Sequence, residues 1–120
     1  MDEFVKLVRR QRDAFTRKDV SALTADLADD YAWFRITEDG SAIKSASGKA
    51  EVAERMGTFF KTVPYTGSRV ERAMTVGNYI VAEEQDTFDT PQGPRTQITL
   101  GVYEIKDGKF RRAWAFPVKT

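Results

Sequence analysis

The stretch Tyr79-Ile-Val-Ala-Glu-Glu-Gln-Asp-Thr-Phe88 decides the fold, because apolar and polar residues alternate along it as they do in a β-strand. One side of that strand would carry Ile80, Ala82, Glu84, Asp86 and Phe88. Two carboxylates among apolar residues are costly to bury unless something neutralises or uses them. Glu84 and Asp86 are therefore the candidate catalytic residues.

Three more strands are predicted around this one. They are expected at residues 68–76, 95–105 and 109–117. Gly77-Asn78 and Asp107-Gly108 are typical of tight hairpins that join neighbouring antiparallel strands. Residues 89–94 contain two prolines and a glycine, so we expect a longer loop there.

The N-terminal half has helical periodicity instead. Amphipathic helices are predicted over residues 2–18, 20–27 and 49–60, with a strand at 31–37. In the first helix an apolar stripe faces inward, and the basic residues, Arg12 among them, are assigned to the solvated side. Helices followed by a run of strands predict an α+β fold, in which three helices cover one face of a curved antiparallel sheet. The length of 120 residues fits one domain, residues 1–120.

Composition excludes several kinds of chemistry. The chain has neither histidine nor cysteine, so catalytic Ser-His and Cys-His pairs and zinc–cysteine sites are ruled out. Acid–base work falls to carboxylates, tyrosines, lysines or water, and we expect no metal and no cofactor. The net charge of +1 is dispersed, which argues against a nucleic-acid surface. The sequence has no apolar run long enough for a membrane span and starts without signal-peptide features, so a cytoplasmic location is expected.

The order of elements and three motifs resemble the nuclear-transport-factor-2-like superfamily. Leu7 to Tyr31 resembles the N-terminal signature of its ketosteroid-isomerase-like members, and Ser47-Gly-Lys-Ala-Glu-Val52 is similar to the start of its third helix. Gly101-Val-Tyr-Glu-Ile-Lys-Asp-Gly-Lys-Phe110 resembles its final hairpin. The resemblance implies a cone-shaped domain with the helices on the concave face of the sheet and a deep pocket between them. It also implies a homodimer packed through the outer sheet face.

The resemblance can be followed to individual catalytic positions. The tyrosine, the general base and the strand acid of ketosteroid isomerases align with Gln11, Arg35 and Gly101, so all three are missing. The limonene-epoxide-hydrolase-like branch matches better, since Asp86 is retained from its relay. Glu84 and Ala115 replace its arginine and its second aspartate, which breaks that relay. The SnoaL-like branch requires mainly a pocket acid, which Asp86 or Glu84 could supply.

Candidate substrate-binding residues are aromatic or small. They are Tyr31, Trp33, Phe59, Phe60, Ala113 and Ala115. Aromatic residues also suit an ordinary core, and the alternation leaves open which face of the strand at 31–37 points inward. The two acids have a structural alternative as well: Arg35, Arg95 or Arg111 could pair with them, or the strand could turn them toward solvent.

These observations predict a pocket for a small apolar or amphipathic molecule. Glu84 and Asp86, about 7 Å apart along a strand, would support cofactor-independent acid–base chemistry of the isomerase, cyclase or hydrolase type. The alternative is a non-catalytic ligand-binding or dimerisation module with the same fold. A homodimer is expected in either case, because both faces of the strand at 95–105 are partly apolar.

Overall fold

Three helices and six strands make up residues 2–118, the part of the chain that the computed structural model describes. The helices are α1 (Glu3–Arg17), α2 (Val20–Ala25) and α3 (Lys49–Thr62). The strands are β1 (Leu27–Ile36), β2 (Ala42–Ser47), β3 (Tyr65–Val76), β4 (Tyr79–Thr90), β5 (Gly93–Lys106) and β6 (Lys109–Pro117). Met1 and residues 119–120, which the predicted domain includes, lie outside the described residues.

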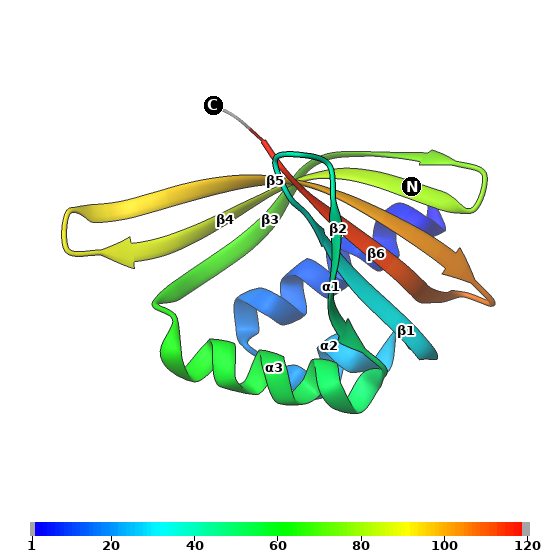
Figure 1. Cartoon of the computed structure of the whole chain (residues 1–120), viewed down its shortest axis with the longest axis horizontal. Coiled ribbons are helices and arrows are strands. Elements are labelled where there is room, and N and C mark those ends of the chain that lie inside the picture. The colour runs from blue at the N-terminus through cyan, green and yellow to red at the C-terminus, as the bar shows by residue number, and fades with distance from the viewer. Residues whose placement is uncertain (1, 119–120) are drawn as a thin grey trace.

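The strands form one curved sheet in the order β2-β1-β6-β5-β4-β3, and the helices lie together on one side of it (Figure 1). This confirms the predicted α+β architecture with three helices in the N-terminal half. The sheet is mixed, however, because β6 returns beside β1 in the same direction, while all other pairs are antiparallel. Register shifts in β3, between Tyr65 and Gly67 and between Val70 and Arg72, bend the strand and help to curve the sheet.

Several sequence predictions for individual elements differ from the structure. The second helix ends at Ala25 instead of the predicted residue 27. Leu27 already belongs to β1, where its side chain is buried in the core with 1% of its surface exposed. Strand β2 was not predicted, since its pairing with β1, not its β-propensity, orders it. The expected loop at 89–94 is mostly strand: Asp89 pairs with Pro94 and Thr90 with Gly93, so the β4–β5 hairpin projects beyond the helices (Figure 1).

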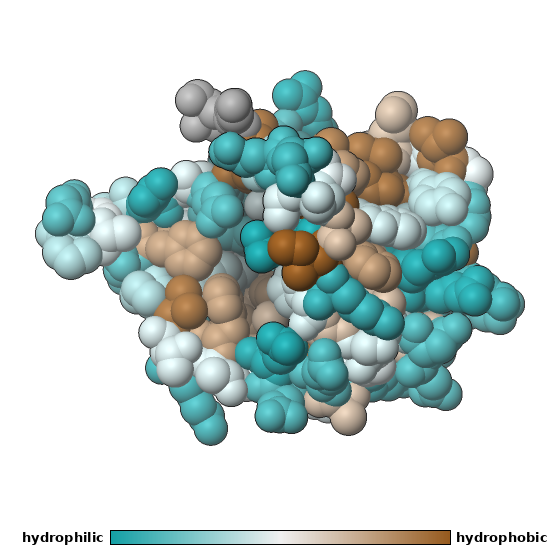
Figure 2. Space-filling model, viewed as in Figure 1, coloured by the Kyte–Doolittle hydropathy of each residue, from teal (hydrophilic) through white to brown (hydrophobic). Residues whose placement is uncertain are grey.

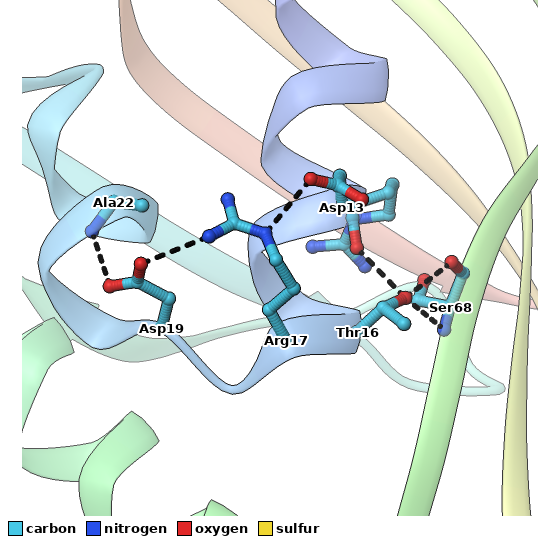
Figure 3. A network of polar contacts seen from close by, with 7 residues as sticks. Asp13, Thr16, Arg17, Asp19, Ala22 and Ser68 are labelled. Carbon is cyan, nitrogen blue, oxygen red and sulfur yellow. Dashed lines mark hydrogen bonds and ion pairs between the residues drawn. The ribbon is translucent and has the colours of Figure 1, made fainter.

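A threonine near the C-terminal end of α1 fixes this helix against β3 (Figure 3). The Thr16 hydroxyl donates to the Ser68 carbonyl oxygen at 2.9 Å and accepts from the Ser68 N–H at 3.0 Å. Arg12 lies one turn before Thr16, so it is on nearly the same side of the helix. Anchoring Thr16 to β3 therefore directs the Arg12 side chain toward the sheet.

The turn from α1 into α2 is held by charged side chains, also seen in Figure 3. Arg17 Nε donates to Asp13 at 3.0 Å, and its Nη1 donates to Asp19 at 3.1 Å. The other Asp19 oxygen caps α2 by accepting from the Ala22 N–H at 3.0 Å. Asp19 is thus the N-cap of the second helix.

The core lies between the helices and the inner face of the sheet. Its most deeply buried large side chains are Val8, Leu23, Leu27, Ile80 and Phe110. Hydrophobic side chains also gather at the surface where α3 meets the start of β3 (Figure 2). Among residues 2–118, none of the helices combines the length and the apolarity that crossing a bilayer would require.

Candidate functional site

A cavity of about 370 Å³ lies between the inner face of the sheet and the helices. Its apolar walls come from all three helices and from β1, β4 and β6. Its buried or partly buried polar side chains are Gln11, Arg12, Tyr31, Tyr65, Glu84, Asp86, Thr99 and Tyr103. The volume falls in the range of small-molecule sites.

Strand β4 turns its acidic face into this cavity. Ile80 and Ala82 are fully buried, and Glu84 and Asp86 follow them on the same face and line the cavity. The other sequence-predicted site residues that line it are Tyr31, Trp33, Phe59, Ala113 and Ala115. Phe60 does not line the cavity, because its ring packs instead against Phe15 and Tyr65, 5.8 and 5.9 Å away between centroids. The functional roles of these residues stay predictions.

Glu84 is held at both carboxylate oxygens. Arg12 Nη1 donates to Glu84 Oε1 at 3.2 Å, and the Tyr103 hydroxyl donates to Oε2. Arg12 and Glu84 are only 8% and 4% exposed, so this is a buried ion pair. The partner is therefore none of the three arginines suggested by sequence, and placing Arg12 on the solvated side of the first helix was wrong.

The burial of Arg12 follows from its position in α1. It comes four residues after Val8 and three before Phe15, which puts it within the apolar stripe. Its guanidinium carbon lies 3.8 Å from the centroid of the Phe15 ring, close enough for a cation–π contact. The helical spacing could have predicted this burial, whereas composition alone suggested a surface arginine.

The electrostatics of the site favour a neutral Tyr103 and a charged Arg12. Burial raises the pKa of Glu84, an effect that Arg12 and Tyr103 oppose and Asp86 reinforces. Burial lowers the pKa of Arg12, but Glu84 and its other neighbours outweigh that effect and raise it overall. Burial also raises the pKa of Tyr103, so its hydroxyl keeps its proton. Within residues 2–118 no group of three His, Cys, Asp or Glu side chains is arranged to hold a metal ion.

Three buried polar atoms at the cavity have no hydrogen-bond partner among residues 2–118. They are Arg12 Nε, the Tyr65 hydroxyl oxygen and Asp86 Oδ1, from α1, β3 and β4. Tyr65 is 2% exposed, and burial, opposed in part by the neighbouring Ser68 side chain, raises its pKa to about 12, so it remains a donor. A buried polar atom without a partner costs about 1–3 kcal/mol. The cavity thus offers one free acceptor and two free donors to a polar group.

Tyr65 was not predicted to belong to this site. The first of the four predicted late strands, β3, begins at Tyr65 rather than at the predicted residue 68. Nothing in the local pattern places the Tyr65 side chain in the cavity, because its position depends on pairing with Phe88 across the sheet. Tyr103, in contrast, alternates with Gly101 and Thr99, so a shared face was evident from the sequence.

Gly101 makes room for the Glu84 carboxylate. A Cβ atom at this position would lie 2.6 Å from Glu84 Oε2 and 2.9 Å from Tyr103 Cε2. The end of a glutamate side chain normally moves aside cheaply, but here Arg12 and Tyr103 both hold it. Glycine at 101 is therefore part of how the site is built.

Replacing Gly101 with alanine is expected to destabilise the fold by about 1–3 kcal/mol, because the added methyl group overpacks the Glu84 site. Urea unfolding measures this change. Gly57→Ala in α3 is the matched control, since a Cβ there meets nothing within 4 Å. Alanine is a better helix former than glycine, so that control should be neutral or slightly stabilising. Equal effects of the two substitutions would contradict the steric explanation.

Comparison with known proteins gives a family-level match. The model of the family described as SnoaL-like domain matches residues 8–113. None of the curated proteins matches the chain by sequence.

Solved structures share the architecture. An LEH-like epoxide hydrolase from M. tuberculosis has a TM-score of 0.76 at 19% identity, covering 97% of this chain and 83% of its own. An NTF2-like protein of unknown function from Burkholderia pseudomallei has a TM-score of 0.76 at 20% identity, covering 98% and 92%. A protein from Catenulispora acidiphila with a ketosteroid isomerase-like fold, in complex with trimethylamine, has a TM-score of 0.76 at 12% identity, covering 92% and 83%. At these identities the likeness establishes the fold alone.

Proposed function

The chain belongs to the SnoaL-like domain family, and we propose that it binds a small amphipathic carbonyl compound in the cavity and moves a proton within it, without a cofactor. The observation that carries this proposal is the set of unpartnered atoms at one cavity. Asp86 Oδ1 can accept a proton, and Tyr65 and Arg12 Nε can donate hydrogen bonds to an oxygen. A base and two donors are what proton abstraction next to a carbonyl requires.

In this mechanism Asp86 is the general base. Its carboxylate takes a proton from the carbon next to the carbonyl, and the electron pair of that C–H bond moves into the C–O unit to give an enolate. The Tyr65 O–H and the Arg12 Nε–H donate to the enolate oxygen, where negative charge develops. Asp86 then returns the proton to another carbon, as in an isomerase, or the enolate carbon attacks a second carbonyl and Asp86 gives the proton to the alkoxide that forms, as in a cyclase.

Glu84 takes a different role from the one predicted by sequence. Both of its oxygens already accept hydrogen bonds, from Arg12 and Tyr103, so Glu84 is less available to a substrate proton than Asp86, whose Oδ1 accepts none among residues 2–118. We propose that Glu84 is a positioning residue that fixes the Arg12 guanidinium with its Nε–H toward the ligand. Asp86 alone would then perform the proton transfer.

The alternative function is a non-catalytic ligand-binding module. The Arg12–Glu84 ion pair favours the binding module, because it occupies one of the two acids that could act as a catalytic base. Both functions use the same cavity and the same unpartnered atoms. They differ only in whether a bound carbonyl compound exchanges its α-protons.

Deuterium exchange separates the two functions. A thermal-shift screen of steroids, terpenoids, polyketides and small epoxides first identifies ligands. Each carbonyl-containing ligand is then incubated with the protein in D₂O, and NMR follows the loss of its α-proton signals. The enzyme is expected to accelerate this loss far above the rate in buffer. Binding without any acceleration would favour the module, and a screen without ligands would contradict both functions.

We further propose that the chain, as a single domain in the cytoplasm, forms a homodimer through its outer sheet face. An apolar row crosses that face through Met74, Val81, Val102, Trp114 and Phe34, which are neighbours in the strand register. Met74 is 61% exposed, and Phe34 stacks on Trp114 with ring centroids 6.0 Å apart. An apolar row of this length usually marks a protein contact.

Light scattering is expected to give twice the chain mass. Val102→Glu, which places a carboxylate in the centre of the row, should shift the protein to monomer without unfolding it. Thermal unfolding would show that the fold is retained. A wild-type monomer at high micromolar concentration would rule the homodimer out.

A further inference from the structure

We propose that the ligand also carries a carboxylate at the end away from its carbonyl group, and that Arg35 binds this carboxylate at the mouth of the cavity. This inference rests on the proposed function, because it assumes that the carbonyl end reaches Asp86. It adds the class of substrate: a keto acid whose charged group stays near the surface.

The first observation is the place of Arg35. Its exposed side chain lines the cavity and also a groove that continues from it along the end of β1 and β6. Gln97, Thr99 and Ala115 line both spaces as well, so the cavity opens into the groove at these residues. Arg35 therefore lies where a ligand longer than the cavity would emerge.

The second observation is that Arg35 has no acidic partner among residues 2–118. Most arginines of the chain pair with a carboxylate, and Arg9 donates to the Val70 carbonyl oxygen at 3.2 Å. Arg9 and Arg95 also lack an ion pair among residues 2–118, but neither of them lines the cavity or the groove. Ala115, the neighbour of Arg35 on β6, carries only a methyl group and lines both the cavity and the groove, so no bulky side chain stands at this position between Arg35 and the cavity.

The third observation is the distribution of charge. Inside, Arg12 pairs with Glu84, so the Asp86 carboxylate is left without a cation of its own. An anionic group would be repelled from that end and attracted to Arg35 at the mouth. The Glu38 carboxylate also lines the groove, but it forms no ion pair with Arg35, whose guanidinium therefore stays open to a ligand. The site is thus polarised along its length, and this polarity orients a keto acid with its carbonyl inward. A carboxylate suits the single guanidinium better than a phosphate monoester, whose charge approaches −2.

A matched pair of probes tests this inference. 5-Oxo-5-phenylpentanoate and its methyl ester have the same aryl ketone and differ in the charge at the far end. Isothermal titration calorimetry at low salt is expected to show about fivefold tighter binding of the acid than of the ester. Arg35→Gln should abolish that preference, so that acid and ester bind equally, while the control Arg95→Gln should keep it. Raising the salt concentration should weaken only the acid.

Each outcome decides something. Equal binding of acid and ester by the wild type, or a preference that survives Arg35→Gln, overturns the inference while the proposed cavity function stands. If neither probe binds, the inference and the proposed binding of carbonyl compounds both fall. Loss of ester binding in Arg35→Gln would show that Arg35 shapes the cavity generally, which also overturns a role specific to the carboxylate.

Discussion

Asp86→Asn is expected to lower α-proton exchange by roughly 10²–10⁴-fold, the usual contribution of a general base. Asparagine has nearly the same shape but cannot take up the proton. The loss should appear in kcat more than in KM, because the amide still fits the ligand. The fold should be as stable as the wild type or slightly more so, since the substitution removes a charge whose Oδ1 atom is buried without a partner among residues 2–118.

The control for this prediction is Asp89→Asn, in the same strand. Asp89 is exposed and lies outside the cavity, so its substitution should change neither exchange nor stability. Exchange and urea unfolding are measured on both variants. If Asp86→Asn strongly destabilises the protein, Asp86 belongs to a structural network. If it folds normally and keeps full exchange, Asp86 is not the base.

The sequence was most informative where side-chain direction follows from alternation along a single strand. Alternation correctly put Glu84 and Asp86 on one face with Ile80 and Ala82, and the depth of burial of these two apolar residues shows that this face points inward. The hairpins at Gly77-Asn78 and Asp107-Gly108 were also predictable, because turn chemistry is local.

The site itself was less predictable, because it is assembled across elements far apart in the sequence. Arg12 and Glu84 are brought together by the packing of α1 on β3 and β4, which no local pattern encodes. Tyr65 reaches the cavity through a strand that begins directly after Pro64. The steric role of Gly101, which the sequence indicated only as the position of a missing acid, depends on its packing against Glu84 and Tyr103.

Arg12→Met is expected to destabilise the protein by about 3–5 kcal/mol near neutral pH, because it leaves the buried Glu84 carboxylate without its cation. Methionine fills a similar volume, so a cavity contributes little to this loss. Such a change is a large part of the 5–15 kcal/mol by which domains are usually stable. Urea unfolding measures it. Arg10→Met is the control, since Arg10 pairs with Asp26 at the surface of the same helix and should cost no more than about 1 kcal/mol.

The pH dependence identifies Glu84 as the cause. Burial raises the folded-state pKa of Glu84 above its ordinary value of 4.5, so between these two values the folded chain binds more protons than the unfolded chain. Stability contributed by protonated Glu84 is therefore complete below about pH 4.5 and is lost as pH rises through the folded pKa. Removing Arg12 raises that pKa further, so the variant should regain stability on acidification more steeply than the wild type.

The double variant Arg12→Met/Glu84→Gln completes this test. Without the buried carboxylate it should recover at least about 2 kcal/mol relative to Arg12→Met and lose most of the steep pH dependence. Recovery would show that the cost of Arg12→Met is the unpaired charge of Glu84. A double variant as unstable as Arg12→Met, with the same pH profile, would instead mean that Arg12 stabilises the fold through its packing on Phe15. The ion pair with Glu84 would then not be the source of that stability.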